Sequence, residues 1–207
     1  MKARIVLALT MALLAAAALP GPAAAFPIAP VGTEGLGVVA SGTDHVVATY
    51  EGNSATYSND LFLMLDAFGN VGDDGDLTND LFIFNNHSSA VGSTIDLDAF
   101  TPGTELLFRL FVHNTGYNYY TGAGTRNPDG KAHARVQDNW NPGVTLVSFE
   151  DLFNTPEYPA GYNDLSFSFT NTTTTVASVP EPGLGSLLLG GMLGLIGLGR
   201  RKLLGSR

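Results

Sequence analysis

The sequence predicts an all-β domain, an antiparallel β-sandwich of the jelly-roll or immunoglobulin-like kind, flanked by an N-terminal signal helix and a C-terminal transmembrane helix. Three observations predict the sandwich. In the middle of the chain, apolar and polar residues alternate with a period of two, which is the repeat of a half-buried strand. Turn-forming clusters of glycine, proline, asparagine and aspartate separate these runs at intervals of roughly 10–15 residues. The same region of this 207-residue chain contains no convincing amphipathic helix.

The N-terminus is typical of a secretory signal peptide at residues 1–25. Two basic residues precede an apolar run at 5–19, which at about 15 residues is too short to span a bilayer. Ala23 and Ala25 supply the small side chains at the −3 and −1 positions of a cleavage site before Phe26. The sequence therefore predicts export through the Sec machinery.

Residues 26–170 make up the predicted sandwich domain. The clearest alternation lies in 106–112 and 165–169, where every second residue is leucine, phenylalanine or valine and belongs to one face. Two continuous apolar runs, 61–65 and 81–84, are typical of strands buried on both faces. The other candidate strands are 38–39, 46–47, 95–97 and 144–149.

Three segments follow one another at the C-terminus. Residues 171–178, which are rich in threonine, are predicted to form an extended linker. The motif Val179-Pro180-Glu181-Pro182 then precedes a charge-free stretch, in which 184–199 is the predicted transmembrane helix. The cluster Arg200-Arg201-Lys202 follows, and by the positive-inside rule it stays cytoplasmic and leaves the acidic domain outside.

This tail, residues 179–207, resembles the PEP-CTERM sorting signal of Gram-negative bacteria in the content and order of its parts. The resemblance implies recognition by an exosortase, an integral-membrane enzyme of transpeptidase type, and cleavage near the Pro-Glu-Pro motif. It implies anchoring in the inner membrane through the C-terminal helix, followed by transfer to the cell surface or release. Proteins with this tail are common in bacteria that make biofilm matrix, so exopolysaccharide is an implied partner.

Charge and composition exclude several classes of function. Residues 26–179 contain 18 acidic and four basic residues, a net charge of −14. Such a domain lacks the basic face that nucleic acids and anionic lipids require. The absence of cysteine excludes disulfides, thiolate metal sites and iron–sulfur clusters. The H-E-x-x-H, G-x-S-x-G, P-loop and Rossmann motifs are also absent, so no enzyme activity is expected.

The first candidate calcium site is the acidic, glycine-rich segment 66–80. Asp73, Asp74 and Asp76 offer the hard oxygen ligands that Ca²⁺ takes, although their spacing is not that of an EF-hand. A solvated acidic turn is the alternative interpretation of the same residues.

The second candidate calcium site joins the ends of two predicted strands. Glu150 and Asp151 follow one strand, and Asn163 and Asp164 precede the next, so their side chains can converge. Clustered carboxylates repel one another and have raised pKa values, and a bound cation relieves that repulsion. The strand parity of Asp164 places its side chain on the outer face of the sheet or in the mouth of the loop.

The motifs Phe149-Glu150-Asp151-Leu152 and Tyr162-Asn163-Asp164-Leu165 resemble those of a domain of unknown function that recurs in exported bacterial proteins. The resemblance maps Glu150, Asp151, Asn163 and Asp164 onto the acidic positions of that domain, and implies either Ca²⁺ ligation or catalysis. Three interpretations stay open: a calcium site, structural hydrogen bonding, and a carboxylate pair for glycoside hydrolysis.

The sequence favours a structural or adhesive protein of the cell surface or extracellular matrix. Tyr117-Asn118-Tyr119-Tyr120 and Trp140 form a candidate aromatic platform for sugar rings, and the alternative is that these tyrosines simply favour strands. The competing functions are a polysaccharide-acting enzyme and an ice-binding protein. An ice-binding face needs regularly spaced threonines, and the threonine run 172–175 lies in the predicted linker.

Overall fold

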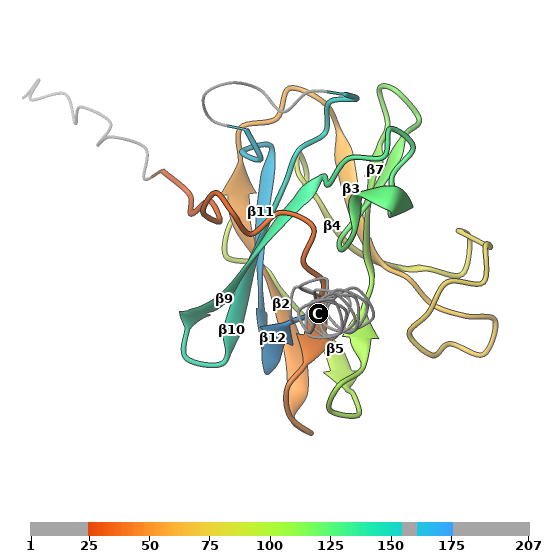
Figure 1. Ribbon diagram of the computed structural model, residues 1–207, viewed down its shortest axis with the longest axis vertical. Helices are drawn as coiled ribbons and strands as arrows, with labels where there is room; N and C mark the ends of the chain where they lie inside the picture. Colours follow the sequence, from red (N-terminus) through yellow and green to blue (C-terminus); the bar gives the residue numbers. More distant parts are fainter. Residues whose placement is uncertain (1–24, 155–160, 176–207) are drawn as a thin grey trace, which may run out of the picture.

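The structure, a computed structural model, describes residues 25–154 and 161–175 and confirms an all-β fold (Figure 1). Its described part contains antiparallel strands, one 3₁₀ turn and no α-helix. The strands are β1 (Val38–Ala40), β2 (His45–Asn53), β3 (Asn59–Leu63), β4 (Leu81–Asn85), β5 (Thr94–Ala99), β6 (Glu105–Leu106), β7 (Phe108–Val112), β8 (Asn118–Tyr120), β9 (Ala134–Asn141), β10 (Val144–Phe149), β11 (Leu165–Thr170) and β12 (Thr172–Thr174), and the turn is η1 (Gly124–Arg126).

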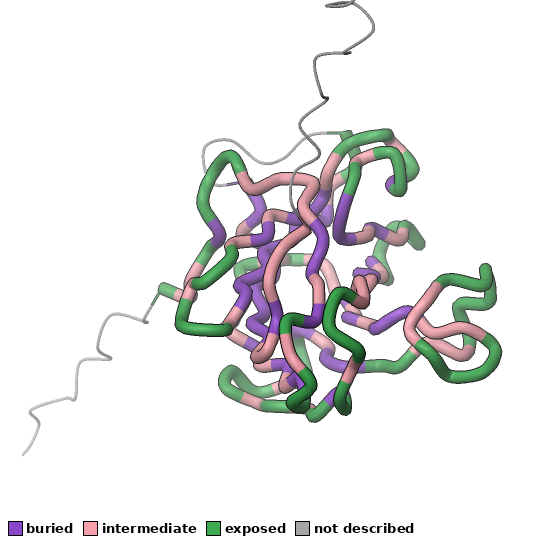
Figure 2. Tube along the Cα trace, turned by 60° about the horizontal axis from the view of Figure 1, so that its bottom comes forward, coloured by how far each residue is buried: buried purple, intermediate pink, exposed green. Residues whose placement is uncertain are grey.

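Two of the three sheets pack face to face in a sandwich-like arrangement. The larger has the strand order β5-β2-β11-β10-β9, and the other has the order β4-β3-β7-β8. Stacked aromatic rings join the two sheets. The ring centroids of Phe84 (β4) and Phe167 (β11) are 6.0 Å apart, and those of Phe108 (β7) and Phe169 (β11) are 4.1 Å apart. The buried residues lie along the strands in the middle of the molecule, while the loops are mostly exposed (Figure 2).

The third sheet, of order β12-β1-β6, corrects the predicted domain boundary. Its strand β12 lies within the predicted linker 171–178, and Val38 of β1 pairs with Thr174. Thr172 is buried, and its Oγ1 donates to the carbonyl of Phe169 at 2.7 Å. Threonine is a good strand former, and a β-branched residue fits a pleated sheet as well as an exposed linker. The folded domain therefore continues at least to Thr175.

The two continuous apolar runs do not form strands that are buried on both faces. In β3 the residues alternate between buried and half-buried, so one face is partly open to solvent. In β4, Leu81 is 38% exposed and Phe82 is 47% exposed. Strands β3 and β4 are partly exposed because their sheet packs against the core on one face only.

The reverse holds for β11, where Ser166 and Ser168 are buried although the sequence pattern placed them on an outer face. Ser166 and Ser148 share a hydrogen bond of 2.8 Å, and the N–H of Ala29 donates to the Ser148 hydroxyl at 2.8 Å. The segment that contains Ala29 therefore covers this face, and the serines supply polar partners beneath it.

The predicted signal peptide and the predicted transmembrane helix lie outside the described residues, apart from Ala25. No helix within the described part of the chain is long and apolar enough to cross a membrane.

Candidate metal centre

The β10–β11 hairpin brings both ends of its connecting loop together at one end of the sandwich. Phe149, the last residue of β10, pairs with Leu165, the first of β11, and the N–H of Asp164 donates to the Phe149 carbonyl at 3.2 Å. The neighbours of this pair, Glu150 and Asp164, are therefore held opposite each other. The expectation that the two strand ends converge is confirmed.

Glu150, Asp151 and Asp164, hereafter the acidic cluster, are all buried. One carboxylate oxygen from each lies within 4.8 Å of the other two. The three residues are 1%, 3% and 6% exposed. Of the two places predicted for Asp164, the outer face is wrong, since the residue is enclosed together with the buried serines that follow it on β11. The mouth of the loop agrees with its position directly before this strand.

Backbone amides stabilise the charged forms of this cluster. The N–H of Asp151 donates to Asp164 Oδ2 at 2.7 Å, and the N–H of Tyr162 donates to Glu150 Oε2 at 3.2 Å. Burial nevertheless raises the pKa of Asp164 to about 8, and the charges of Asp151 and Glu150 act in the same direction. The Asp164 carboxylate therefore favours a bound proton or a nearby cation.

Two amide oxygens near the cluster lack hydrogen-bond partners among the described residues. Asn59 is fully buried, and its Nδ2 donates to Asp151 Oδ2 at 2.8 Å while its Oδ1 accepts nothing. The side chain of Asn163 donates to the Ser54 hydroxyl at 2.8 Å, and its Oδ1 is likewise buried and unpartnered. Buried polar atoms are normally paired, so orphaned oxygens indicate an absent partner.

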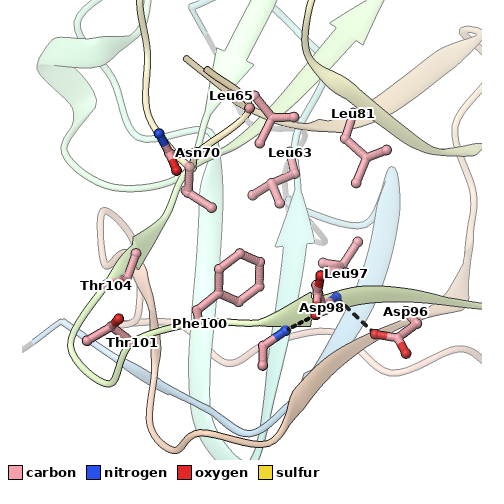
Figure 3. Close-up of a pocket in the computed structure, with 13 residues that line it drawn as sticks. Leu63, Leu65, Asn70, Leu81, Asp96, Leu97, Asp98, Phe100, Thr101 and Thr104 are labelled. Atoms are coloured by element: carbon pink, nitrogen blue, oxygen red, sulfur yellow. Dashed lines mark hydrogen bonds between the residues drawn. The ribbon is translucent and has the colours of Figure 1, made fainter. Parts of the chain in front are cut away.

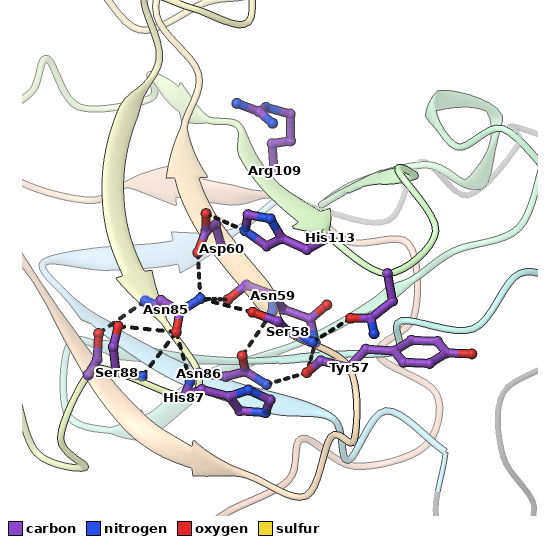
Figure 4. A network of polar contacts seen from close by, with 12 residues as sticks. Tyr57, Ser58, Asn59, Asp60, Asn85, Asn86, His87, Ser88, Arg109 and His113 are labelled. Atoms are coloured by element: carbon purple, nitrogen blue, oxygen red, sulfur yellow. Dashed lines mark hydrogen bonds and ion pairs between the residues drawn. The ribbon is translucent and has the colours of Figure 1, made fainter.

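Asn59 is held in place by its own neighbours (Figure 4). Its backbone N–H donates to Asn86 Oδ1 at 2.8 Å, and Asn86 Nδ2 donates to the carbonyl of Tyr57 at 2.8 Å. This amide network fixes the start of β3 beside the hairpin of the opposite sheet. No local pattern of residues predicts this contact, because the meeting of Asn59 with Asp151 depends on how the two sheets pack.

A cavity of about 250 Å³ adjoins the acidic cluster and has a mainly polar lining. Its wall includes both Asp151 and Asp164, so an ion in the cavity would reach two of the three carboxylates. The other lining residues are Ser54, Thr56, Tyr57 and Leu152.

Sequence reasoning also missed the histidine that supports the cluster. His133 Nδ1 lies 2.9 Å from the carbonyl oxygen of Glu150, and its Nε2 lies 2.9 Å from Asp129 Oδ2. Its ring stacks on Tyr119 at 3.7 Å. The signal for it was positional, because His133 directly precedes β9, whose first residue pairs with Phe149.

The structure does not bring the first candidate set together. Asp73, Asp74 and Asp76 are exposed, and each accepts a hydrogen bond from the backbone N–H two residues ahead. Within the described residues, the acidic cluster is the one group of three acidic or histidine side chains that could share an ion. The segment that contains Asp73, Asp74 and Asp76 therefore has the geometry of a solvated acidic turn.

A larger cavity, of about 690 Å³, lies elsewhere (Figure 3). Leu63, Leu97 and Phe100 provide an apolar wall, and Asp96 lies at one side. The Asp96 carboxylate already has hydrogen-bond partners: its Oδ1 accepts the N–H of Asp98 at 2.9 Å and also lies 2.9 Å from His45 Nδ1. This cavity brings no group of carboxylates to one point.

Comparisons with protein-family models, with curated proteins and with solved structures found nothing that matches this chain. Its function is therefore inferred from the geometry of the residues.

Proposed function

We propose that this protein is an exported structural or adhesive module of the cell surface or extracellular matrix, whose sandwich is stabilised by Ca²⁺ bound between Glu150, Asp151 and Asp164. The observation that supports the metal is the convergence of three buried carboxylates within 4.8 Å. Three carboxylates held this close together repel one another, and a divalent cation bound between them offsets most of that repulsion.

The ligand types favour calcium over transition metals. The cluster offers carboxylate oxygens. Asn59, whose Nδ2 donates to Asp151, and Asn163, next to Asp164 in the chain, each carry a buried Oδ1 with no partner among the described residues. Calcium takes six to eight such oxygens with flexible geometry, whereas Mg²⁺ retains several waters and suits a buried site less well. An exported protein would meet enough Ca²⁺ to fill even a weak site.

The export half of the proposal rests on the two ends of the chain. The signal peptide at 1–25, the motif Val179-Pro180-Glu181-Pro182 and the transmembrane helix 184–199 direct the domain through the Sec machinery to an exosortase. The product is a surface or matrix protein associated with exopolysaccharide. We also propose that the sandwich is of the jelly-roll or immunoglobulin-like kind.

The competing functions receive less support from the geometry. The two carboxyl groups of glycosidases flank a cleft at about 5 Å or more, with room for a sugar between them. In the acidic cluster all three residues are buried, whereas a glycosidase exposes its carboxyl pair to the sugar. Against ice binding, the threonine run begins with a buried Thr172 and pairs with β1.

The test is thermal unfolding of residues 26–178 in EDTA and in millimolar Ca²⁺. At 100 times its dissociation constant, one bound ion stabilises the fold by about 2.7 kcal/mol, which raises the midpoint by several degrees. Asp151→Asn and Asp164→Asn should abolish the rise, and Asp74→Asn in the exposed loop should keep it.

The Asp164→Asn variant also separates the metal from purely structural hydrogen bonding. With a metal site, Asp164→Asn replaces a carboxyl whose charged form is unfavourable without a cation, so the domain in EDTA stays as stable as the wild type or becomes more stable. With a purely structural role, the variant is destabilised equally in EDTA and in Ca²⁺. A wild-type midpoint that is the same in both buffers would exclude the metal.

A further inference from the structure

A groove follows β8, the edge strand of the β4-β3-β7-β8 sheet, and among the described residues it shares no lining residue with the cavity beside the acidic cluster. Two hollows of about 380 Å³ and 350 Å³ lie there, and they have Tyr120 and Arg126 in common. Because both hollows are lined by these two residues, they lie side by side, and together they are called the β8 groove. Tyr117 and Asn118 line one half of it, and Asp73 lies in the other.

The groove presents aromatic rings to solvent. Tyr117 is 38% exposed and stacks on Phe153, which is 40% exposed, at 4.9 Å between ring centres. Tyr120 is half-buried, while Tyr119 between them points into the core. Exposed ring faces beside a groove suit the apolar C–H faces of pyranose rings, since stacking there removes both surfaces from water.

The polar groups beside these rings are fixed before any ligand binds. The Arg126 guanidinium forms two bonds to the Glu105 carboxylate, at 2.7 Å and 3.0 Å. Asn118 Oδ1 accepts a bond from Arg109 Nη1 at 2.8 Å, and this orients its amide nitrogen. Preorganised groups lose little conformational entropy on binding, which favours recognition of ligand hydroxyls.

The free edge of β8 is unsuited to an added peptide strand. The N–H of Tyr120 already donates to Asn127 Oδ1 at 2.7 Å, and Asn127 Nδ2 donates to the carbonyl of Lys131 at 2.7 Å. A peptide that added to the sheet would have to displace this side chain. The groove therefore favours a ligand that is recognised by its rings and hydroxyls.

The negative charge of the domain determines which kind of polysaccharide the groove can bind. Residues 26–179 have a net charge of −14. Within the groove, Arg126 is neutralised by Glu105 and Asp73 adds a negative charge. A polymer of uronic acids would be repelled, and a neutral polymer would not.

We propose that the β8 groove binds a neutral polysaccharide chain, with Tyr117 and Tyr120 stacking on sugar rings and with Asn118 and Arg126 bonding to hydroxyls. This site gives the surface module of the proposed function its partner, but it contains none of the proposed metal ligands. The two ideas can therefore fail separately.

The experiment is affinity electrophoresis of the full chain in a sugar-free polyoxyethylene detergent. Native gels contain hydroxyethylcellulose, galactomannan or xyloglucan as neutral polymers, or alginate as the acidic one. We expect retardation by at least one neutral polymer and none by alginate. Tyr117→Ala and Tyr120→Ala should weaken the apparent affinity at least tenfold, with Phe68→Ala, at an exposed ring outside the groove, as the matched control.

Tyr117 is exposed, so its variant should fold, and an unchanged thermal midpoint verifies this. Retardation by none of the neutral polymers, or by alginate alone, would overturn the proposal. So would full retention of binding in both tyrosine variants, or a loss of binding in Trp140→Ala instead, which would move the aromatic platform to the tip of the β9–β10 hairpin. Because the gels are run both in EDTA and in Ca²⁺, a missing metal site changes the unfolding result without removing glycan binding.

Discussion

At the scale of single residues, the fold relies on buried polar pairs such as Asp129 and His133. Their side chains are 0% and 3% exposed and lie 2.9 Å apart. Burial alone would raise the pKa of Asp129, but bonds from His133 and from the N–H groups of Lys131 and Asn154 outweigh it, so the pKa is lowered below 3.8. A carboxylate whose pKa is depressed by folding stabilises the protein above its unfolded pKa, and this contribution is lost as the pH falls through the folded value.

We therefore expect the free energy of unfolding to fall as the pH drops below about 4. Asp129→Asn should lower it by about 1–3 kcal/mol at pH 7, because a buried hydrogen bond is lost, and should flatten its pH dependence below pH 4. Urea unfolding at pH 7 and pH 3 measures both effects. If variant and wild type had the same pH dependence, Asp129 would not be the source of the stability lost below pH 4.

Gly52 is a second residue on which the fold depends. Its φ is +139°, and a Cβ there would lie 2.6 Å from the Cβ of Phe26, the first residue after the predicted cleavage site. Gly52→Ala should destabilise the domain by about 1–3 kcal/mol through backbone strain and displacement of Phe26. Gly143→Ala, with φ +69° and open space around it, should cost less. Thermal unfolding compares the two, and equal losses would show that Phe26 does not contribute.

At the scale of elements, β12 is the strand on which sequence and structure differ most. Besides its pairing with β1, the N–H of Thr175 donates to the Gly37 carbonyl at 3.0 Å, and the N–H of Ser41 donates to the Asn171 carbonyl at 2.9 Å. A chain that ends at the predicted boundary, Thr170, should be several kcal/mol less stable than residues 26–178, at about 1 kcal/mol for each lost hydrogen bond. Equal urea midpoints would show that β12 adds nothing to stability.

The elements also explain how much could be predicted. Alternation identified β7 and β11, because their apolar residues share the face toward the core, but it did not predict that the polar face of β11 is buried too. The convergence of Glu150 with Asp164 followed from the ends of adjacent strands. By contrast, Asn59 reaches the acidic cluster from the opposite sheet, and β3 and β4 lie against the core on one face only. Both facts depend on packing between sheets, which no local pattern of residues encodes.

At the scale of the whole molecule, one short segment connects the proposed metal centre to the β8 groove. Glu150 and Asp151 begin the loop after β10, and Phe153, two residues farther along, stacks on Tyr117 of the groove. An ion that fixes the start of this loop also fixes the ring that supports Tyr117. The two sites should therefore be coupled, and such couplings typically amount to 5–150-fold in affinity.

We expect the affinity for the neutral polysaccharide to be at least fivefold higher in Ca²⁺ than in EDTA. By reciprocity, a soluble oligosaccharide of the same polymer should strengthen Ca²⁺ binding by the same factor, which calorimetry on the full chain can measure. Phe153→Ala should remove the difference between the two buffers while both ligands still bind, because it cuts the contact without touching either set of ligating groups. Glycan affinities that are equal in EDTA and Ca²⁺, in a protein that binds both, would show that the sandwich holds two independent sites and that the Phe153–Tyr117 stack transmits nothing between them.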